Sequence, residues 1–326
     1  MVLAVLTRSP MTAPRTAGRS LRTIVRLAFV VAAAALLVWA VYREREDFGA
    51  AVGSLAPATV VGALALVFGA LGFNLLAWRE AMSAVGIDAP FASSARVFFL
   101  SQLGKYVPGS VWSIVAQIEL TRDAGVSRLR GVVGATVALV VGVVTSSVLA
   151  CGLLVLPDPQ VRSRYGWVLL VVPFAATALQ PSVLRRLITL VLRMTGRSGT
   201  VPPLSGWALL RSVAWSAGMW CLLGAHAWLI ADGLAPARPA SVVIVTGAFA
   251  LAWVVGFLVV IAPAGIGVRE AALVLALSSV LDTPDALALA LVSRVLMTVA
   301  DGVAAALASA SYGRERLRAD RQSSLE

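Results

Sequence analysis

Two ionisable residues lie deep inside the last apolar run of the chain, LALALVSRVLMTVADGVAAAL. Arg294 and Asp301 are seven residues apart, so on a helix they lie two turns apart on the same face. A charge at the centre of a bilayer costs about 2.5 to 3.5 kcal/mol on the insertion scale, so we expect this face to line the inside of a helix bundle. An architectural ion pair and a site for a charged ligand would both explain the placement.

A second group of charges follows a proline that interrupts apolar sequence. In IAPAGIGVREAAL, Pro263, Gly265 and Gly267 precede the adjacent pair Arg269 and Glu270. Proline cannot donate a backbone hydrogen bond, and glycine permits tight backbone conformations, so the pattern predicts a helix break. In hydrocarbon the freed backbone groups must be buried in protein or face a water-filled cavity. A turn at the membrane surface, with Arg269 reaching into headgroup water, is the open alternative.

A similar pattern occurs about 155 residues earlier, in GKYVPGSVWSIVAQIEL. Lys105 precedes Pro108 and Gly109, and Glu119 follows in the next helical run. Broken helices at corresponding places of two halves are typical of transporter binding sites, and the helix N-termini there suit an anionic group. The sequence therefore predicts a pseudo-repeat in which Lys105 and Arg269 attract a phosphate.

The intramembrane polar residues need partners inside the bundle. Asn74 and Gln117 are expected to form interhelical hydrogen bonds, and His226 is expected to be a packed polar residue. The expected ion pairs are Arg294 with Glu270 or Glu119, and Asp301 with Lys105 or Arg269.

Composition places most of the chain in lipid, because its 326 residues are 59% hydrophobic and only 13% charged. The formal net charge is +11, and the basic residues lie mostly between apolar runs. This favours anionic lipid headgroups over nucleic acid as the counter-charge. The single histidine and the two cysteines lie inside apolar runs, and no nucleotide-binding or nucleophile motif occurs. We therefore expect no enzyme, no metal and no cofactor.

The apolar runs predict an all-α, polytopic transmembrane helix bundle with about 7–8 spans and two broken or re-entrant helix motifs in a pseudo-repeat. Residues 1–22 are expected to be a basic cytoplasmic segment, 23–311 a transmembrane domain and 312–326 a polar tail. The segment 185–197 is expected to lie in the headgroup layer as an amphipathic helix. The expected spans are 27–42, 57–78, 131–156, 166–179, 207–230, 241–261 and 286–310.

Loop charges predict a multi-pass membrane protein with a cytoplasmic N-terminus. Arg79 and the segment 185–197 are both expected inside, so the chain around Pro108 should dip in and return, or lie at the surface, rather than cross. The run 241–261 is expected to cross and to bring the Pro263 motif back to the cytoplasmic face. If the helix after that motif fails to cross, the arginine-rich tail ends outside, against the charge rule, and the sequence leaves this conflict open.

Both motifs resemble those of the lysylphosphatidylglycerol synthase transmembrane-region family. These are flippase-like proteins related to the membrane half of the multiple peptide resistance factor. The second motif is close to the family's Pro-Gly-Gly-hydrophobic-Gly-x-x-Glu signature, and the resemblance covers about residues 20–312. The matching residues are Pro108, Gly109, Gly265, Gly267, Glu270 and the late-helix Arg294, and the departures are Ser110, Trp112 and Ala264.

The resemblance implies a protein that binds and translocates a lipid with an anionic headgroup, either a phospholipid or a polyprenyl-phosphate lipid. Lys105 and Arg269 would attract the phosphate, while Glu270, Arg294 and Asp301 would neutralise or gate the path. Some relatives carry a soluble C-terminal domain that attaches an amino acid to the lipid, but this chain stops about fifteen residues after its last span, so we expect no aminoacyl transfer. The alternative is a non-transporting membrane partner of a separately encoded lipid synthase or glycosyltransferase.

Overall fold

The computed structural model describes residues 53, 55–106, 112–123, 125–157, 159–194, 200–235, 241–258 and 267–323. These residues form helices and no strand, which confirms the predicted all-α class. The first expected span lies outside the described residues, as do Pro108, Gly109, Pro263 and Gly265. The helices are α3 (Pro57–Ser83), α4 (Phe91–Gln102), η1 (Leu103–Tyr106), α5 (Trp112–Asp123), α6 (Arg128–Val155), α7 (Pro159–Tyr165), η2 (Gly166–Leu170), α8 (Val171–Ala178), α9 (Pro181–Met194), α10 (Gly206–Leu234), α11 (Val242–Leu258), α12 (Val268–Leu277) and α13 (Thr283–Ser323).

Four of these helices are long and apolar enough to cross a membrane, namely α3, α6, α10 and α13 as far as Gly313. The segment α7–α8 together with α9 adds a fifth span at most, so the described residues contain fewer crossings than the sequence predicts. Helix α3, with 27 residues, is roughly 40 Å long at 1.5 Å per residue, which exceeds the hydrocarbon core of a bilayer. The chain is therefore a multi-pass helical membrane protein.

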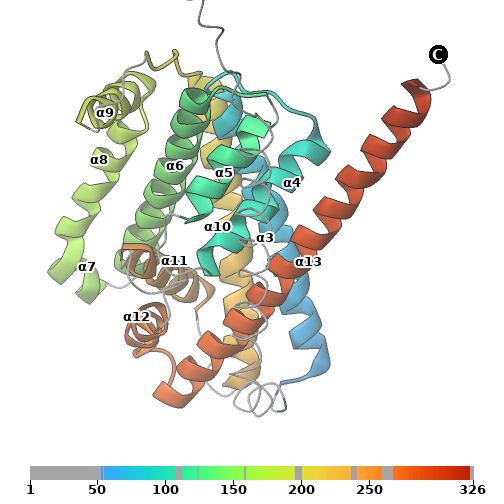
Figure 1. Ribbon diagram of the computed structural model, residues 1–326. Helices are drawn as coiled ribbons and strands as arrows, with labels where there is room; N and C mark the ends of the chain where they lie inside the picture. Colours follow the sequence, from blue (N-terminus) through green and yellow to red (C-terminus); the bar gives the residue numbers. More distant parts are fainter. Residues whose placement is uncertain are drawn as a thin grey trace, which may run out of the picture.

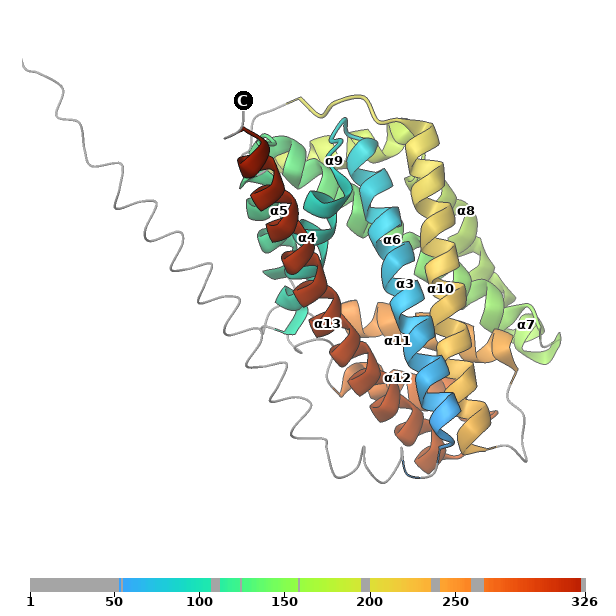
Figure 2. The same ribbon diagram turned by 90° about the vertical axis from the view of Figure 1, so that its right-hand side faces the viewer.

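The spans α3 and α10 lie side by side along the bundle (Figures 1 and 2). Side chains of α10 reach the backbone of α3 at both ends of this contact. The Ser212 hydroxyl donates to the carbonyl of Ala77 at 2.7 Å, and Nδ1 of His226 lies 2.9 Å from the carbonyl oxygen of Ala63. These bonds satisfy polar groups that lipid could not, so the two helices form a fixed wall of the bundle.

Helix α3 ends and α6 begins at the upper end of the bundle in Figure 2. We call this the arginine-rich end, because Arg79, Arg122, Arg128, Arg185 and Arg211 lie on the elements that meet there. Helices α4, η1 and α5 lie between α3 and α6 in the chain and pack against one another; we call them the first hairpin. The chain returns to the end from which it came, as the loop charges predict for the segment around Pro108.

Close packing within the first hairpin depends on Gly104 in η1. A Cβ atom at this position would lie 2.7 Å from the backbone nitrogen of Ser113, at the start of α5. Real Cβ atoms do not approach backbone atoms so closely, so a larger residue would force η1 and α5 apart. The small residue is what allows the hairpin to close.

Helix α10 ends and α13 begins at the opposite, lower end of the bundle (Figure 2). Helices α11 and α12 lie across the lower half between them and pack against each other; we call them the second hairpin (Figures 1 and 2). The expected crossing by 241–261 is therefore wrong. Helix α11 has 17 residues, roughly 26 Å at 1.5 Å per residue, and the chain comes back through α12 instead of leaving at the other face.

This correction removes the conflict over the arginine-rich tail. Because α13 starts at the lower end and crosses, its C-terminal end lies at the arginine-rich end (Figures 1 and 2). The two hairpins thus enter the bundle from opposite ends, each placed between two spans.

Helix α9 turns by 84° relative to the α7–α8 segment before it. It lies across the arginine-rich end in Figure 1, with Leu184, Ile188 and Leu192 buried and Arg185 and Arg186 exposed. An apolar face against the bundle and a basic face outward fit a helix in the headgroup layer. This agrees with the expectation for 185–197, of which the part up to Met194 is described.

Candidate functional site

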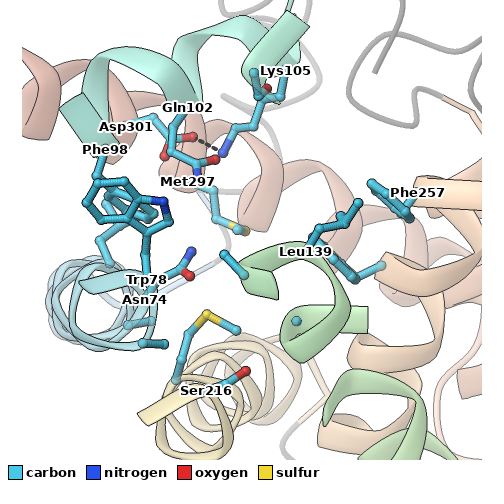
Figure 3. Close-up of a pocket in the computed structure, with 18 of the residues that line it drawn as sticks. Asn74, Trp78, Phe98, Gln102, Lys105, Leu139, Ser216, Phe257, Met297 and Asp301 are labelled. Atoms are coloured by element: carbon cyan, nitrogen blue, oxygen red, sulfur yellow. Dashed lines mark ion pairs between the residues drawn. The ribbon is translucent and has the colours of Figure 1, made fainter. Parts of the chain in front are cut away.

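A cavity of about 310 Å³ opens between the two hairpins, and α3, α6, α10 and α13 complete its walls. Its lining holds three cations, Lys105, Arg269 and Arg294, but only one carboxylate, Asp301. Figure 3 shows Lys105 and Asp301 meeting at one side of this space, with Met297 beside them. The cavity is therefore positively charged and lies within the membrane-spanning bundle.

Asp301 on α13 is held by the first hairpin. Its carboxylate is 1% exposed and lies 2.5 Å from Nζ of Lys105. The Tyr106 hydroxyl donates to the same carboxylate oxygen at 2.6 Å and lies 3.3 Å from the hydroxyl of Thr298. Of the two partners that the sequence allowed for Asp301, the structure selects Lys105. Two donors on one oxygen stabilise the ionised carboxylate despite its burial.

Arg294, two turns earlier on α13, is held by the second hairpin. Its Nη1 atom lies 2.7 Å from Oε1 of Glu270, and the two side chains are 15% and 20% exposed. The other carboxylate oxygen of Glu270 accepts the backbone N–H of Gly267 at 2.6 Å and so caps the N-terminus of α12. Gly267 has a φ of 82°, a region that favours glycine. Glu270 therefore fixes the start of α12 and the position of Arg294 together.

Arg269 is the cation of the cavity that pairs with no carboxylate of the described residues. Its guanidinium lies 4.9 Å from the ring centre of Phe249, and Nη2 lies 3.5 Å from the sulfur of Met297. An aromatic face and a thioether are weak partners for a full charge. Among the described residues, most N–H groups of this guanidinium therefore have no hydrogen-bond acceptor.

Glu119 does not belong to this site, contrary to the sequence prediction. Its carboxylate lies 3.8 Å from Nη1 of Arg122 and 3.6 Å from Nη2 of Arg128, and it does not line the cavity. Arg122 is three residues later on α5 and so shares its face, and Arg128 approaches from the start of α6. Glu119 therefore binds the turn at the arginine-rich end instead of Arg294.

The uncharged polar residues divide into two kinds. His226 is fully buried between Ala63 and Ser293, whose hydroxyl lies 3.0 Å from Nε2, so it is a packed polar residue as predicted. Asn74 and Gln117 instead line the cavity, and their amides hydrogen-bond to none of the described residues. The interhelical hydrogen bonds expected for these two amides are absent from the described part of the chain.

Sequence reasoning missed several residues that line the cavity. Tyr106 could have been predicted to line the cavity, because it is adjacent to Lys105 in sequence. Trp78 and Trp220 lie in apolar runs, where an aromatic residue is usually core, so type and spacing alone did not distinguish them. Among the described residues, no three His, Cys, Asp or Glu side chains come close enough to hold a metal ion.

Comparisons with known proteins place the chain in a family. A search of curated proteins gives no match. The family model described as the lysylphosphatidylglycerol synthase TM region matches residues 23–305. This stretch contains both hairpins and every residue that lines the cavity. The chain therefore belongs to the lysylphosphatidylglycerol synthase TM region family.

Proposed function

We propose that this protein binds the anionic headgroup of a membrane lipid in the cavity and moves it across the bacterial plasma membrane. The lipid is a phospholipid or a polyprenyl-phosphate lipid. The observation that carries the proposal is Arg269, a cation inside the bundle without a carboxylate partner among the described residues, beside two further cations. A flippase-like role for the family supports the same reading.

In this proposal, a bound ligand changes the two ion pairs that α13 forms with the hairpins. A phosphate that reaches Arg269 also comes within the field of Lys105 and Arg294, which line the same cavity. It competes with Asp301 and Glu270 for these cations, because a phosphate accepts the same charge-assisted hydrogen bonds as a carboxylate. Binding therefore loosens the contacts between α13 and the hairpins, and release of the lipid restores them. Such exchange lets the hairpins move without leaving a buried charge unpaired for long.

In this proposal the arginine-rich end faces the cytoplasm, in accord with the positive-inside rule. The N-terminus is cytoplasmic, as loop charges indicate. Transport runs downhill or on an ion gradient, because the chain has no nucleotide-binding motif. The protein carries out no covalent chemistry on the lipid in this account.

Transport is tested by reconstituting the purified chain into vesicles that contain a fluorescent phosphatidylglycerol in both leaflets. A membrane-impermeant reductant then bleaches the outer leaflet. We expect a second decay phase, from lipid that the protein delivers to the outer leaflet, which protein-free vesicles lack. Arg269→Gln should abolish that phase, and Arg186→Gln, on the exposed face of α9, should leave it unchanged.

Two outcomes would overturn the proposal. One is a wild-type decay identical to that of protein-free vesicles, across several anionic lipids. The other is transport by Arg269→Gln at the wild-type rate. Absence of transport combined with co-purification of a lipid synthase or glycosyltransferase would favour the alternative role of a non-transporting membrane partner.

A further inference from the structure

Uncharged polar and aromatic side chains line the part of the cavity away from the charged residues. Asn74 and Trp78 are four residues apart on α3, so they share a face, and Ser216 and Trp220 do so on α10. Figure 3 shows Asn74, Trp78 and Ser216 around one side of the cavity, apart from the Lys105–Asp301 pair. The first hairpin adds the polar side chains of Ser101, Gln102, Ser113 and Gln117, and α10 adds Ser212.

These groups have hydrogen-bonding capacity that the described residues leave unused. The indole N–H groups of Trp78 and Trp220 are buried and have no hydrogen-bond partner among the described residues. The amides of Asn74, Gln102 and Gln117 likewise bond to none of the described residues. Buried polar groups are almost always paired, and leaving one unpaired costs about 1 to 3 kcal/mol. The three amides are buried or half-buried and line the cavity, so a ligand that displaces water from the cavity would pair with them.

The chemistry of this lining selects the ligand. Amide side chains both donate and accept hydrogen bonds, as hydroxyl groups do, and they carry no charge. Aromatic side chains also line the cavity: Trp253 stacks on Phe257 at 5.5 Å between ring centres and meets Trp220 edge-on at 5.5 Å. A ring that carries several hydroxyls offers both hydrogen-bonding groups and C–H faces. An ammonium group would instead meet three cations and one carboxylate in the same lining.

We infer that the lipid headgroup bound here is a phosphate ester of an uncharged polyhydroxyl ring. The inference rests on the proposed function, and it assigns a substrate class to the same site. The phosphate binds at Arg269, and the ring lies along Asn74, Gln117 and Trp78. The cavity volume of about 310 Å³ lies at the lower end of the range for small-molecule sites, which suits one phosphate and one ring. A phosphatidylinositol and a polyprenyl-phosphoryl hexose both carry this unit.

Binding to the full chain in detergent, measured by titration calorimetry, tests the inference. The probes are short-chain phosphatidylinositol, a short polyprenyl-phosphoryl hexose and short-chain phosphatidic acid, whose phosphate carries no ring. We expect at least one of the two ring-bearing lipids to bind about tenfold more tightly than phosphatidic acid, because only the ring pairs with the amides. Which ring-bearing probe binds identifies the source of the lipid.

Two variants and a matched control locate the effect. Asn74→Leu and Gln117→Leu should each weaken binding of the ring-bearing lipid about tenfold and leave phosphatidic acid binding unchanged. Gln180→Leu replaces an exposed amide outside the cavity and should change neither affinity. Unfolding midpoints without ligand should show that all three variants are folded.

The outcomes separate this inference from the proposed function. Equal affinity for all three probes, or variants that weaken phosphatidic acid as much as the ring-bearing lipid, would overturn the inference and leave lipid transport intact. Failure of the wild-type chain to bind any of the three anionic probes would overturn both.

Discussion

The two hairpins are similar in plan but present opposite charges to α13. Each lies between two spans and contacts α13, but the first gives a cation, Lys105, to Asp301, and the second gives an anion, Glu270, to Arg294. They also enter from opposite ends of the bundle. The difference shows that α13 is the common partner, with one charge for each hairpin at a spacing of two helical turns.

The hairpins also differ in how completely their charges are satisfied. In the first, Asp301 accepts from both Lys105 and Tyr106. In the second, Glu270 pairs with Arg294, while Arg269 contacts an aromatic ring and a thioether. The excess positive charge therefore belongs to the second hairpin, and we expect an anion to bind there first. Variants of the two hairpins should differ accordingly.

The largest effect is expected at the second hairpin. Arg294→Ala removes the partner of a mostly buried carboxylate, which costs about 3 to 5 kcal/mol when the other charge stays unpaired. We expect a clear fall in the unfolding midpoint in detergent. The double variant Glu270→Gln/Arg294→Gln should regain most of that stability while losing lipid transport. An unchanged midpoint in Arg294→Ala would show that this pair does not hold the hairpin to α13.

A smaller loss is expected when the first hairpin loses its cation. Lys105→Met leaves Asp301 with the Tyr106 hydroxyl as donor, so we expect a cost of about 2 kcal/mol. The double variant Lys105→Met/Asp301→Asn should recover part of it. Unfolding midpoints of Lys105→Met and Arg294→Ala, measured side by side, test which variant loses more stability. A larger loss in Lys105→Met would reverse the comparison between the hairpins.

Packing within the first hairpin gives a further test that involves no charge. Gly104→Ala places a methyl group against the backbone of Ser113 and should destabilise the protein by about 1 to 2 kcal/mol. Gly72→Ala is the matched control, because nothing lies within 4 Å of a Cβ built there. It should be neutral or slightly stabilising, since alanine favours the helix. Equal midpoints for the two variants would show that η1 and α5 are not closely packed.

The smallest effect is expected at Glu119, outside the cavity. Its pairs with Arg122 and Arg128 are longer than 3.5 Å and partly exposed, so Glu119→Gln should change stability by less than about 1 kcal/mol. Lipid transport should keep the wild-type rate. Loss of transport in this variant would show that Glu119 takes part in transport although it does not line the cavity.

Much of the charged site could be predicted from residue type and spacing. The seven-residue interval of Arg294 and Asp301 placed both on one face, and the few charges within apolar sequence left few partners for them. The fold of 241–261 could not be predicted in this way. Its 21 residues are mostly apolar and long enough to span a bilayer, and only the positions of α10 and α13 show that the chain turns back.

The neutral lining could not be predicted for a different reason. Asn74 and Gln117 were recognisable as polar residues in apolar runs, but sequence does not show whether an amide meets another helix or a cavity. Trp78 and Trp220 have the same apolar neighbours as core residues. Their distinguishing property, an indole N–H without a partner, depends on packing against segments far away in the chain.

An experimental density map of the chain in lipid nanodiscs containing the lipid that it transports tests the central claim most directly. The account predicts headgroup density inside the cavity, with the phosphate within hydrogen-bonding distance of Arg269 and the rest of the headgroup toward Asn74. Ordered lipid only on the outer surface of the bundle, with Arg269 paired to a protein carboxylate, would contradict it.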